Sequence, residues 1–228
     1  MHATKMANPN LPIRSLSFLV FWFFISGGFL TMAIAQRTWC VANPMFSSSV
    51  LIANLDYACS QVDCSSIQQG GSCFYPNTEI HHASFAMNLQ YQTLGRHISD
   101  CDFRSSGLIS LTDPSIGSCT FQSGGDLVEE GAPSVMQNGT WCVAKPGTRD
   151  DLLQQNINYA CNNVDCSPST DDDGSCYNPT TLINHASFAM NLYYQSMGRN
   201  STSCDFKQTG LIIMTDPSYG QCSYSSGY

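Results

Sequence analysis

The stretch NTEIHHASFAMNLQYQTLGR, residues 77–96, recurs with few changes as NPTTLINHASFAMNLYYQSMGR at residues 178–199. Each copy begins with Asn and Thr residues that suit a helix N-cap, and each stops at a glycine, Gly95 or Gly198. These are typical start and stop signals of a helix. The repeated stretch therefore predicts the same long helix twice in one chain.

Twelve cysteines extend the repeat outward from these helices. The first six are separated by 19, 5, 9, 28 and 18 positions, and the second six by 19, 5, 10, 28 and 18. Because a module of about 80 residues has a marginal hydrophobic core, cross-links must supply part of its stability. Six cysteines per copy predict three disulfides, each contributing about 2–4 kcal/mol. The predicted disulfide cysteines are Cys40, Cys59, Cys64, Cys73, Cys101 and Cys119, followed by Cys142, Cys161, Cys166, Cys176, Cys204 and Cys222.

A zinc site is the alternative use of some of these thiols. Cys59, Cys64 and Cys73 could join His82 around one ion. The chain has no Cys-x2-Cys pair, however, and six thiols per module suit bridging in an oxidising compartment. We therefore expect disulfides, with no metal site and no cofactor.

The N-terminal segment predicts that compartment. Lys5 and Arg14 precede the apolar run LSFLVFWFFISGGFLTMAIA of residues 16–35, which ends in Ala-Ile-Ala. This pattern predicts a signal peptide over residues 1–35, cleaved before Gln36, and hence a secreted, extracellular protein. An uncleaved anchor is the alternative, since the run is about as long as a membrane span. No second apolar run follows, so no stable membrane insertion is expected after cleavage.

Composition along the chain sets the expected domain boundaries. The first module covers residues 36–121, a linker rich in Gly and acidic residues covers 122–139, and the second module covers 140–228. Two separate modules on a flexible connector are expected. The sequons at Asn138 and Asn200 predict N-linked glycans.

A shorter helix is predicted between the first and second cysteines of each copy, where apolar residues recur at near-helical spacing. These residues are Leu51, Leu55 and Ala58 in the first copy and Leu153, Ile157 and Ala160 in the second. After the fifth cysteine come GLISLTDPSIGSC, residues 107–119, and GLIIMTDPSYGQC, residues 210–222. Each is a β-prone run followed by an Asp-Pro-Ser turn. The predicted class is α+β: two small disulfide-stapled modules, each mainly two helices with a short antiparallel sheet.

The net charge excludes several partners. The whole chain carries −8, and removal of residues 1–35 leaves seven basic residues against 17 acidic ones, a net charge of −10. That balance argues against nucleic acid and against an anionic membrane surface. A neutral partner fits better, while the oligomeric state stays open.

Catalysis is not expected. Glycoside hydrolysis needs two carboxylates facing each other across the scissile bond. Two acidic positions persist in both copies: Asp102 with Asp205, and Asp113 with Asp216. The first pair follows a cysteine, which is a cramped place for a general acid, and the second pair sits in Thr-Asp-Pro-Ser turns that favour a capping role. The shared histidine, His82 or His185, has no duplicated nucleophile beside it, so we expect it to be packed and hydrogen-bonded.

Aromatic side chains remain as binding candidates. A tyrosine offers an apolar ring with a polar tip, which suits a partly open groove for a sugar chain. The candidates are Tyr75, Tyr91 and Arg96 in the first copy and Tyr177, Tyr193, Tyr194, Arg199 and Tyr219 in the second. The tyrosines would stack on glucose faces, and the arginines would donate hydrogen bonds to hydroxyls. Other aromatic residues are expected in the core, namely Tyr57, Phe85, Tyr159 and Phe188.

The two copies differ at candidate sugar-facing positions. Tyr193, Tyr219 and Tyr224 of the second copy replace Gln90, Ile116 and Phe121 of the first. The second module is therefore expected to bind more strongly, by tenfold or more if each ring contributes about 1 kcal/mol.

Several motifs together resemble one known family. WCVA at residues 39–42 and 141–144, the HASFAMN..YQ..GR helices, CDF and TDPS.G.C closely resemble the plant X8 domain, also known as carbohydrate-binding module family 43. Such modules are found at the C-terminus of plant endo-1,3-β-glucanases, and stand-alone members include the plasmodesmal callose-binding proteins. The resemblance implies a two-helix fold with a short antiparallel sheet. It also implies three disulfides per module: Cys40–Cys101, Cys59–Cys64 and Cys73–Cys119, with the corresponding pairs in the second copy.

The resemblance also implies non-catalytic binding of β-1,3-glucan, a callose-type polysaccharide, in the cell wall. We therefore expect a secreted protein with two aromatic-lined grooves. A structural or protein-interaction wall module without sugar affinity is the alternative, and a small-lipid carrier with an apolar tunnel is a third possibility.

Overall fold

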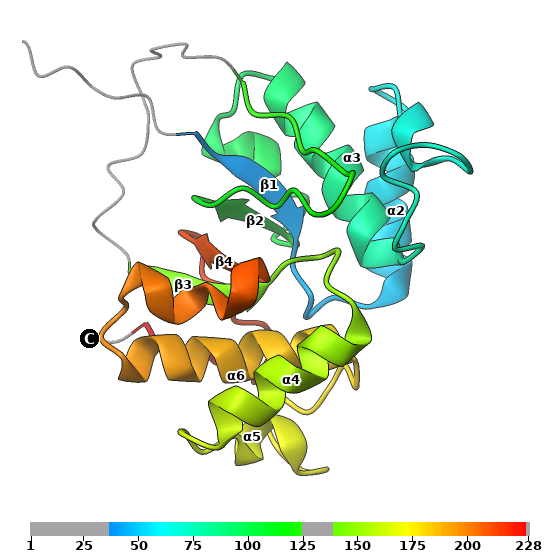
Figure 1. The fold of residues 1–228 in the computed structure, drawn as a ribbon. Coiled ribbons are helices and arrows are strands. Elements are labelled where there is room, and N and C mark those ends of the chain that lie inside the picture. Colours follow the sequence, from blue (N-terminus) through cyan, green and yellow to red (C-terminus); the bar gives the residue numbers. More distant parts are fainter. Residues whose placement is uncertain (1–36, 125–138, 227–228) are drawn as a thin grey trace, which may run out of the picture. The chain divides into compact units, whose positions relative to one another are not determined.

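The computed structural model describes residues 37–124 and 139–226, which belong to one compact unit. Each copy folds into a strand, a helix, a longer helix and a returning strand, with short helical turns between them (Figure 1). The first copy contains β1 (Trp39–Ala42), α2 (Ser48–Cys59), η1 (Ser65–Ile67), α3 (Glu79–Thr93), η2 (Ile98–Cys101) and β2 (Gly107–Ser110). The second contains β3 (Trp141–Ala144), α4 (Asp150–Cys161), α5 (Ser167–Thr170), α6 (Leu182–Ser196), η3 (Ser201–Cys204), η4 (Phe206–Gln208) and β4 (Gly210–Ile213). The predicted α+β class is confirmed.

The repeated stretch forms helices α3 and α6, and its capping signals act as expected. The side chain of Thr78 accepts a hydrogen bond from the backbone N–H of His81 at 3.4 Å, and Thr181 does the same for Asn184 at 3.3 Å. Each bond satisfies one of the free N–H groups of a first helical turn. Both helices stop just before Gly95 and Gly198, which adopt positive φ.

The serine and asparagine of the HASFAMN motif fasten each long helix to the first strand of its module. In the first copy, Ser84 Oγ accepts from Ala42 N at 2.9 Å and Asn88 Oδ1 accepts from Cys40 N at 3.1 Å. The second copy repeats these bonds through Ser187 and Asn191, at 3.1 and 3.2 Å. Because all four side chains are fully buried, removing one would leave a strand N–H unpaired at a cost of about 1–3 kcal/mol.

The strands of both modules form one antiparallel sheet in the order β1-β2-β4-β3. Within the modules, Trp39 pairs with Ser110 and Trp141 pairs with Ile213. Between them, β2 meets β4 where Ser110 lies opposite Ile213. The backbone bonds at this junction run from Leu111 N to Ile212 O at 2.8 Å and from Met214 N to Ile109 O at 3.0 Å.

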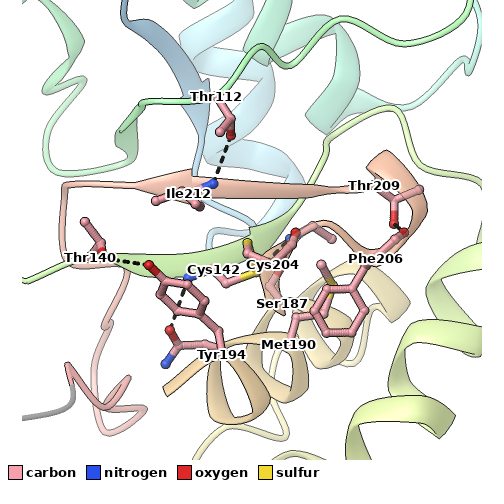
Figure 2. The surroundings of a disulfide bond; sticks show 12 residues. Thr112, Thr140, Cys142, Ser187, Met190, Tyr194, Cys204, Phe206, Thr209 and Ile212 are labelled. Carbon is pink, nitrogen blue, oxygen red and sulfur yellow. Dashed lines mark hydrogen bonds between the residues drawn. A yellow bond between two sulfur atoms is a disulfide. The ribbon is translucent and has the colours of Figure 1, made fainter. Parts of the chain in front are cut away.

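Two threonines complete the junction between the modules. Thr112 Oγ1 accepts from Ile212 N at 2.9 Å, as Figure 2 shows, and Thr215 Oγ1 accepts from Ile109 N at 3.0 Å. The two bonds are equivalent, because Thr112 and Thr215 occupy the same place in the two Thr-Asp-Pro-Ser turns. Each module thus caps a strand of the other.

A shared apolar core accompanies the shared sheet. Val41 and Leu108 of the first module pack in one cluster with Trp141, Leu211 and Tyr224 of the second. The described parts of the two modules are therefore not separate, because the strand edges and apolar faces that they share are buried together. The expected flexible linker lies mostly outside the described residues.

The structure joins the cysteines in the pairs that the family resemblance implies: Cys40–Cys101, Cys59–Cys64, Cys73–Cys119, Cys142–Cys204, Cys161–Cys166 and Cys176–Cys222. The long loops, closed over 46 to 62 residues, each stabilise the fold by about 4 kcal/mol in a chain-entropy estimate. Figure 2 shows how the Cys142–Cys204 bond links β3 to the end of η3. The zinc alternative is excluded, because its three thiols are all in disulfides.

Some expectations fall outside the described residues. These are the signal peptide over residues 1–35, most of the linker and the sequon asparagine Asn138. Across residues 37–124 and 139–226, every helix is too short or too polar to cross a lipid bilayer.

Candidate functional site

A groove of about 390 Å³ opens on the second module between α4, α6 and the segment from η3 to η4. We refer to it as the α4–α6 groove. It combines rings with hydrogen-bonding groups, and its lining residues are Leu152, Gln155, Asn156, Tyr159, Tyr193, Thr202, Ser203, Asp205, Phe206 and Lys207.

Three aromatic rings cluster along this groove. The ring centroids of Tyr159 and Tyr193 lie 5.2 Å apart, and Phe206 lies 6.0 Å from Tyr159 and 5.7 Å from Tyr193. All three pairs meet edge to face, with interplanar angles of 67–87°. Such contacts fix the orientation of the rings, which reduces the entropy cost of ordering these side chains when a ligand binds.

The two tyrosine hydroxyls of the cluster lie 3.0 Å apart and share one hydrogen bond. This bond is the main reason why the pKa of Tyr193 is raised above its ordinary value. One hydroxyl proton serves the mutual bond, and the other hydroxyl is left with a proton to donate. A neutral polar ligand with hydroxyl groups matches this pair.

Charged and amide groups surround the rings. Asp205 and Lys207 lie on the η3–η4 side of the groove, and Gln155 lies on α4. Together they offer an acceptor, a donor and an amide that can serve as either. The arrangement can hold a polyhydroxylated chain, because rings contact its CH-rich faces while the rim exchanges hydrogen bonds.

The turn that presents Phe206 and Lys207 has an unusual backbone. Phe206, Lys207 and Gln208 have φ values of 42°, 56° and 67°, in the left-handed region that non-glycine residues rarely adopt. Thr209 Oγ1 donates to Phe206 O at 2.6 Å and holds the turn closed. The following Gly210 is required, since a Cβ there would lie 1.7 Å from the carbonyl oxygen of Cys204. Strain of this kind concentrates at functional sites.

The first module keeps the turn but has a reduced ring cluster. Phe103 repeats the positive φ at 41°, and its ring lies 6.3 Å from Tyr57. The position of Tyr193 is taken by Gln90, which is buried. The three-ring cluster of the second module therefore becomes a two-ring pair in the first.

Two of the predicted groove residues, Tyr91 and Tyr194, lie in the core. Their exposed fractions are 1% and 2%, and their hydroxyls bond at 2.8 Å to the hydroxyls of Thr38 and Thr140 (Figure 2 for Tyr194). Burial also raises the pKa of Tyr91. The expectation that these rings line a groove is wrong, because they anchor the long helices to the strands. Tyr224, another candidate from the comparison of the copies, is likewise buried.

The remaining predicted tyrosines do not form one site. Tyr75 is 76% exposed and meets Phe74 edge to face at 4.9 Å, while Tyr219 is 52% exposed and lies 4.5 Å from Phe46 of the other module. Tyr177 stacks on His185 at 5.6 Å. Of the eight predicted side chains, Tyr193 alone lines the α4–α6 groove.

Tyr75 and Tyr177 are not equivalent, although their sequences suggest a pair. Tyr177 directly follows Cys176 and its carbonyl oxygen lies 2.7 Å from His185 Nε2. In the first copy, the residue that follows the cysteine and meets His82 in this way is Phe74, at 2.9 Å. Both contacts confirm that the shared histidine is packed and hydrogen-bonded.

Arg96 and Arg199 lie at the ends of the long helices, where they have positive φ values of 69° and 61°. Their backbone N–H groups donate to the carbonyl oxygens of Tyr91 and Tyr194 at 3.1 and 3.0 Å, so both residues close the last helical turn. Arg199 Nη1 also donates to Ser226 O at 3.4 Å. Neither arginine lines the α4–α6 groove.

The acidic residues that recur in both copies have two different surroundings. Asp113 and Asp216 accept backbone bonds from Ser115 and Ser218 at 2.8 and 2.9 Å, which confirms their role in the turns. Asp205 is exposed and lines the groove, so its position is more open than the sequence suggested.

Sequence reasoning missed Tyr159 and its counterpart Tyr57, which were assigned to the core. Their exposed fractions are 54% and 57%. A signal was present, because Tyr159 follows Ile157 by two positions and therefore lies about 200° around the helix from it. The apolar stripe of α4 thus faces inward while Tyr159 faces the groove.

Comparison with known proteins gives the same family twice along the chain. The model of the X8 domain matches residues 38–108 and 140–211, one match in each module. The family models that match are X8 domains alone.

Curated relatives come from plants. A glucan endo-1,3-beta-D-glucosidase of Olea europaea is 52% identical over 96 residues, which cover 42% of this chain and 21% of the relative. The major pollen allergen Ole e 10 of Olea europaea is 48% identical over 96 residues, 41% of this chain and 77% of the allergen. Plasmodesmata callose-binding protein 2 of Arabidopsis thaliana is 42% identical over 90 residues, 39% of this chain and 46% of that protein. The alignment thus spans only about a fifth of the glucosidase.

Proposed function

Because the chain belongs to the X8 domain family, we propose that it is a secreted, non-catalytic protein that binds β-1,3-glucan of the plant cell wall. The observation that carries the proposal is the ring cluster of Tyr159, Tyr193 and Phe206 in a groove with a hydrogen-bonding rim. One relative is a plasmodesmata callose-binding protein, which supports the choice of polymer.

The chemistry of the groove fits a neutral glucan better than a charged ligand. Its rings offer apolar faces to the CH groups of a glucose unit, and the tyrosine hydroxyls exchange hydrogen bonds with the sugar hydroxyls. The rim carries one carboxylate, Asp205, and one ammonium group, Lys207, so neither sign of charge dominates. The negative net charge of the chain disfavours anionic polymers as well.

Disulfides at all six predicted pairs support an oxidising, extracellular location. The second module is proposed as the stronger binder, because Gln90 replaces the third ring in the first. The wall is then the natural compartment for such a protein and its polymer.

A sedimentation assay tests the proposal. Residues 36–228, obtained by expression through a secretory pathway, are mixed with insoluble β-1,3-glucan, cellulose or chitin. We expect retention on β-1,3-glucan, and we expect the Tyr159→Ala/Phe206→Ala double variant to reduce it to the weaker binding of the first module. The double variant Tyr75→Ala/Tyr219→Ala is the matched control, since both tyrosines are exposed but lie outside the groove. Absence of retention on all three polymers would instead favour the protein-interaction role.

A further inference from the structure

The sequon Asn200-Ser201-Thr202 lies at one lip of the α4–α6 groove. Asn200 is exposed and caps η3, and Thr202 and Ser203, two and three positions later, line the groove. Asn200 Oδ1 accepts hydrogen bonds from the backbone N–H of Thr202 at 3.1 Å and from its hydroxyl at 3.0 Å. The amide of Asn200 is therefore tied directly to a residue of the groove wall.

The two amide atoms of Asn200 have different tasks. The cap bonds use Oδ1, whereas N-glycosylation occurs at Nδ2. In that step a bond forms between Nδ2 and C1 of a polyprenyl-diphosphate-linked oligosaccharide. The bond between C1 and the diphosphate oxygen breaks, the diphosphate leaves, and the amide loses one proton. Because Oδ1 keeps both lone pairs, the cap of η3 is compatible with the modified side chain.

We propose that Asn200 carries an N-linked glycan that stands at the lip of the α4–α6 groove and limits the entry of long glucan chains. The inference rests on the proposed function of the same groove. The first sugar is attached to the same amide group that accepts a hydrogen bond from the hydroxyl of Thr202. A glucan chain that runs past Thr202 and Ser203 therefore meets the glycan. A short oligosaccharide confined to the rings Tyr159, Tyr193 and Phe206 does not.

The restriction falls on one module only. The position of Asn200 is occupied in the first module by His97, whose N–H donates to Asp100 Oδ2 at 2.9 Å at the start of η2. No sequon exists there. The glycan thus affects the module that carries the three-ring cluster, and it offsets part of the affinity difference between the two copies.

The test uses the full chain expressed through a secretory pathway, in an Asn138→Gln background so that one sequon remains. Mass spectrometry of the peptide that contains Asn200 measures occupancy. Binding of polymeric β-1,3-glucan and of its trisaccharide is then compared between Asn200→Gln, which abolishes the sequon, and Ser201→Ala, which keeps it. Trimming of the glycan to its first N-acetylglucosamine, on the unchanged Asn200, gives a second comparison that leaves the cap intact.

We expect Asn200 to be glycosylated and Asn200→Gln to bind the polymer about tenfold more tightly than Ser201→Ala, with equal affinity for the trisaccharide. Trimming should move the polymer affinity in the same direction. An unmodified Asn200 peptide, or equal polymer affinity with and without the glycan, would overturn the inference while leaving the proposed function standing. If the form without glycan binds neither ligand, the proposed function and the inference both fail.

Discussion

Replacing Tyr193 by Gln gives the second module the residue that the first has at this place, Gln90. The change removes a ring that lies 5.2 Å from Tyr159 and 5.7 Å from Phe206, and it breaks the 3.0 Å bond between the tyrosine hydroxyls. A ring contact of this type contributes about 0.5–1.5 kcal/mol beyond its buried area. With the loss of stacking area on the ligand, we expect about 1.4 kcal/mol, which is a tenfold weaker affinity.

Isothermal titration with a soluble β-1,3-glucan hexasaccharide measures this difference. The control is Tyr219→Gln, because Tyr219 is an exposed tyrosine of the same module that does not line the groove. Thermal unfolding of both variants excludes a loss of folded protein as the cause. Affinity unchanged by Tyr193→Gln, or reduced equally by Tyr219→Gln, would refute the assignment of the groove.

Three further predictions concern stability. Tyr194→Phe removes the 2.8 Å bond to Thr140 and should lower the free energy of unfolding by about 1 kcal/mol in urea titrations, with glucan affinity unchanged; a loss of affinity would return Tyr194 to the site. Thr215→Val leaves the N–H of Ile109 in the other module without its acceptor and should cost about 1–3 kcal/mol, whereas Ser223→Ala, at an exposed position, should cost nothing measurable. Burial, with the nearby His82 as a lesser cause, lowers the pKa of His81 to about 4. Between about pH 6.5 and 4 the unfolded chain therefore binds a proton that the folded chain does not. The free energy of unfolding should fall as the pH drops through that window, by about 3 kcal/mol in total. His81→Asn, which introduces the residue of the second copy, should flatten the pH dependence of the unfolding midpoint, and an unchanged slope would contradict the assignment.

The helices and the number of disulfides were predictable from the residues themselves, whereas the pairing of the cysteines came from the family resemblance. Thr78 and Gly95 bracket α3 in the sequence just as they do in the structure, and the spacing of the cysteines repeats without regard to the rest of the fold. Local patterns of this kind specify an element through its own backbone groups.

The orientation of the tyrosines was not predictable in the same way. Tyr193 and Tyr194 are adjacent, so their side chains point about 100° apart around α6, and composition alone does not say which one faces outward. The answer lies in Thr140, more than fifty residues away, whose hydroxyl holds Tyr194 inside. The strands WCVA were not predicted at all, because four residues are too few to show alternation.

The junction between β2 and β4 also lay beyond local patterns. The Thr-Asp-Pro-Ser stretches read as turns, and their aspartates do cap those turns. The threonines, however, act on the opposite copy, where Thr112 meets Ile212 and Thr215 meets Ile109. A contact between residues about 100 positions apart leaves no trace in the sequence near either one.

The pairing of β2 with β4 makes the two repeats a single structural unit. Severing it between the repeats would leave each half with a bare strand edge, and such edges recruit other strands. Val41 and Leu108 would at the same time lose the cover of Trp141 and Leu211. Either half on its own is therefore expected to bind a substitute neighbour, such as a second copy of itself.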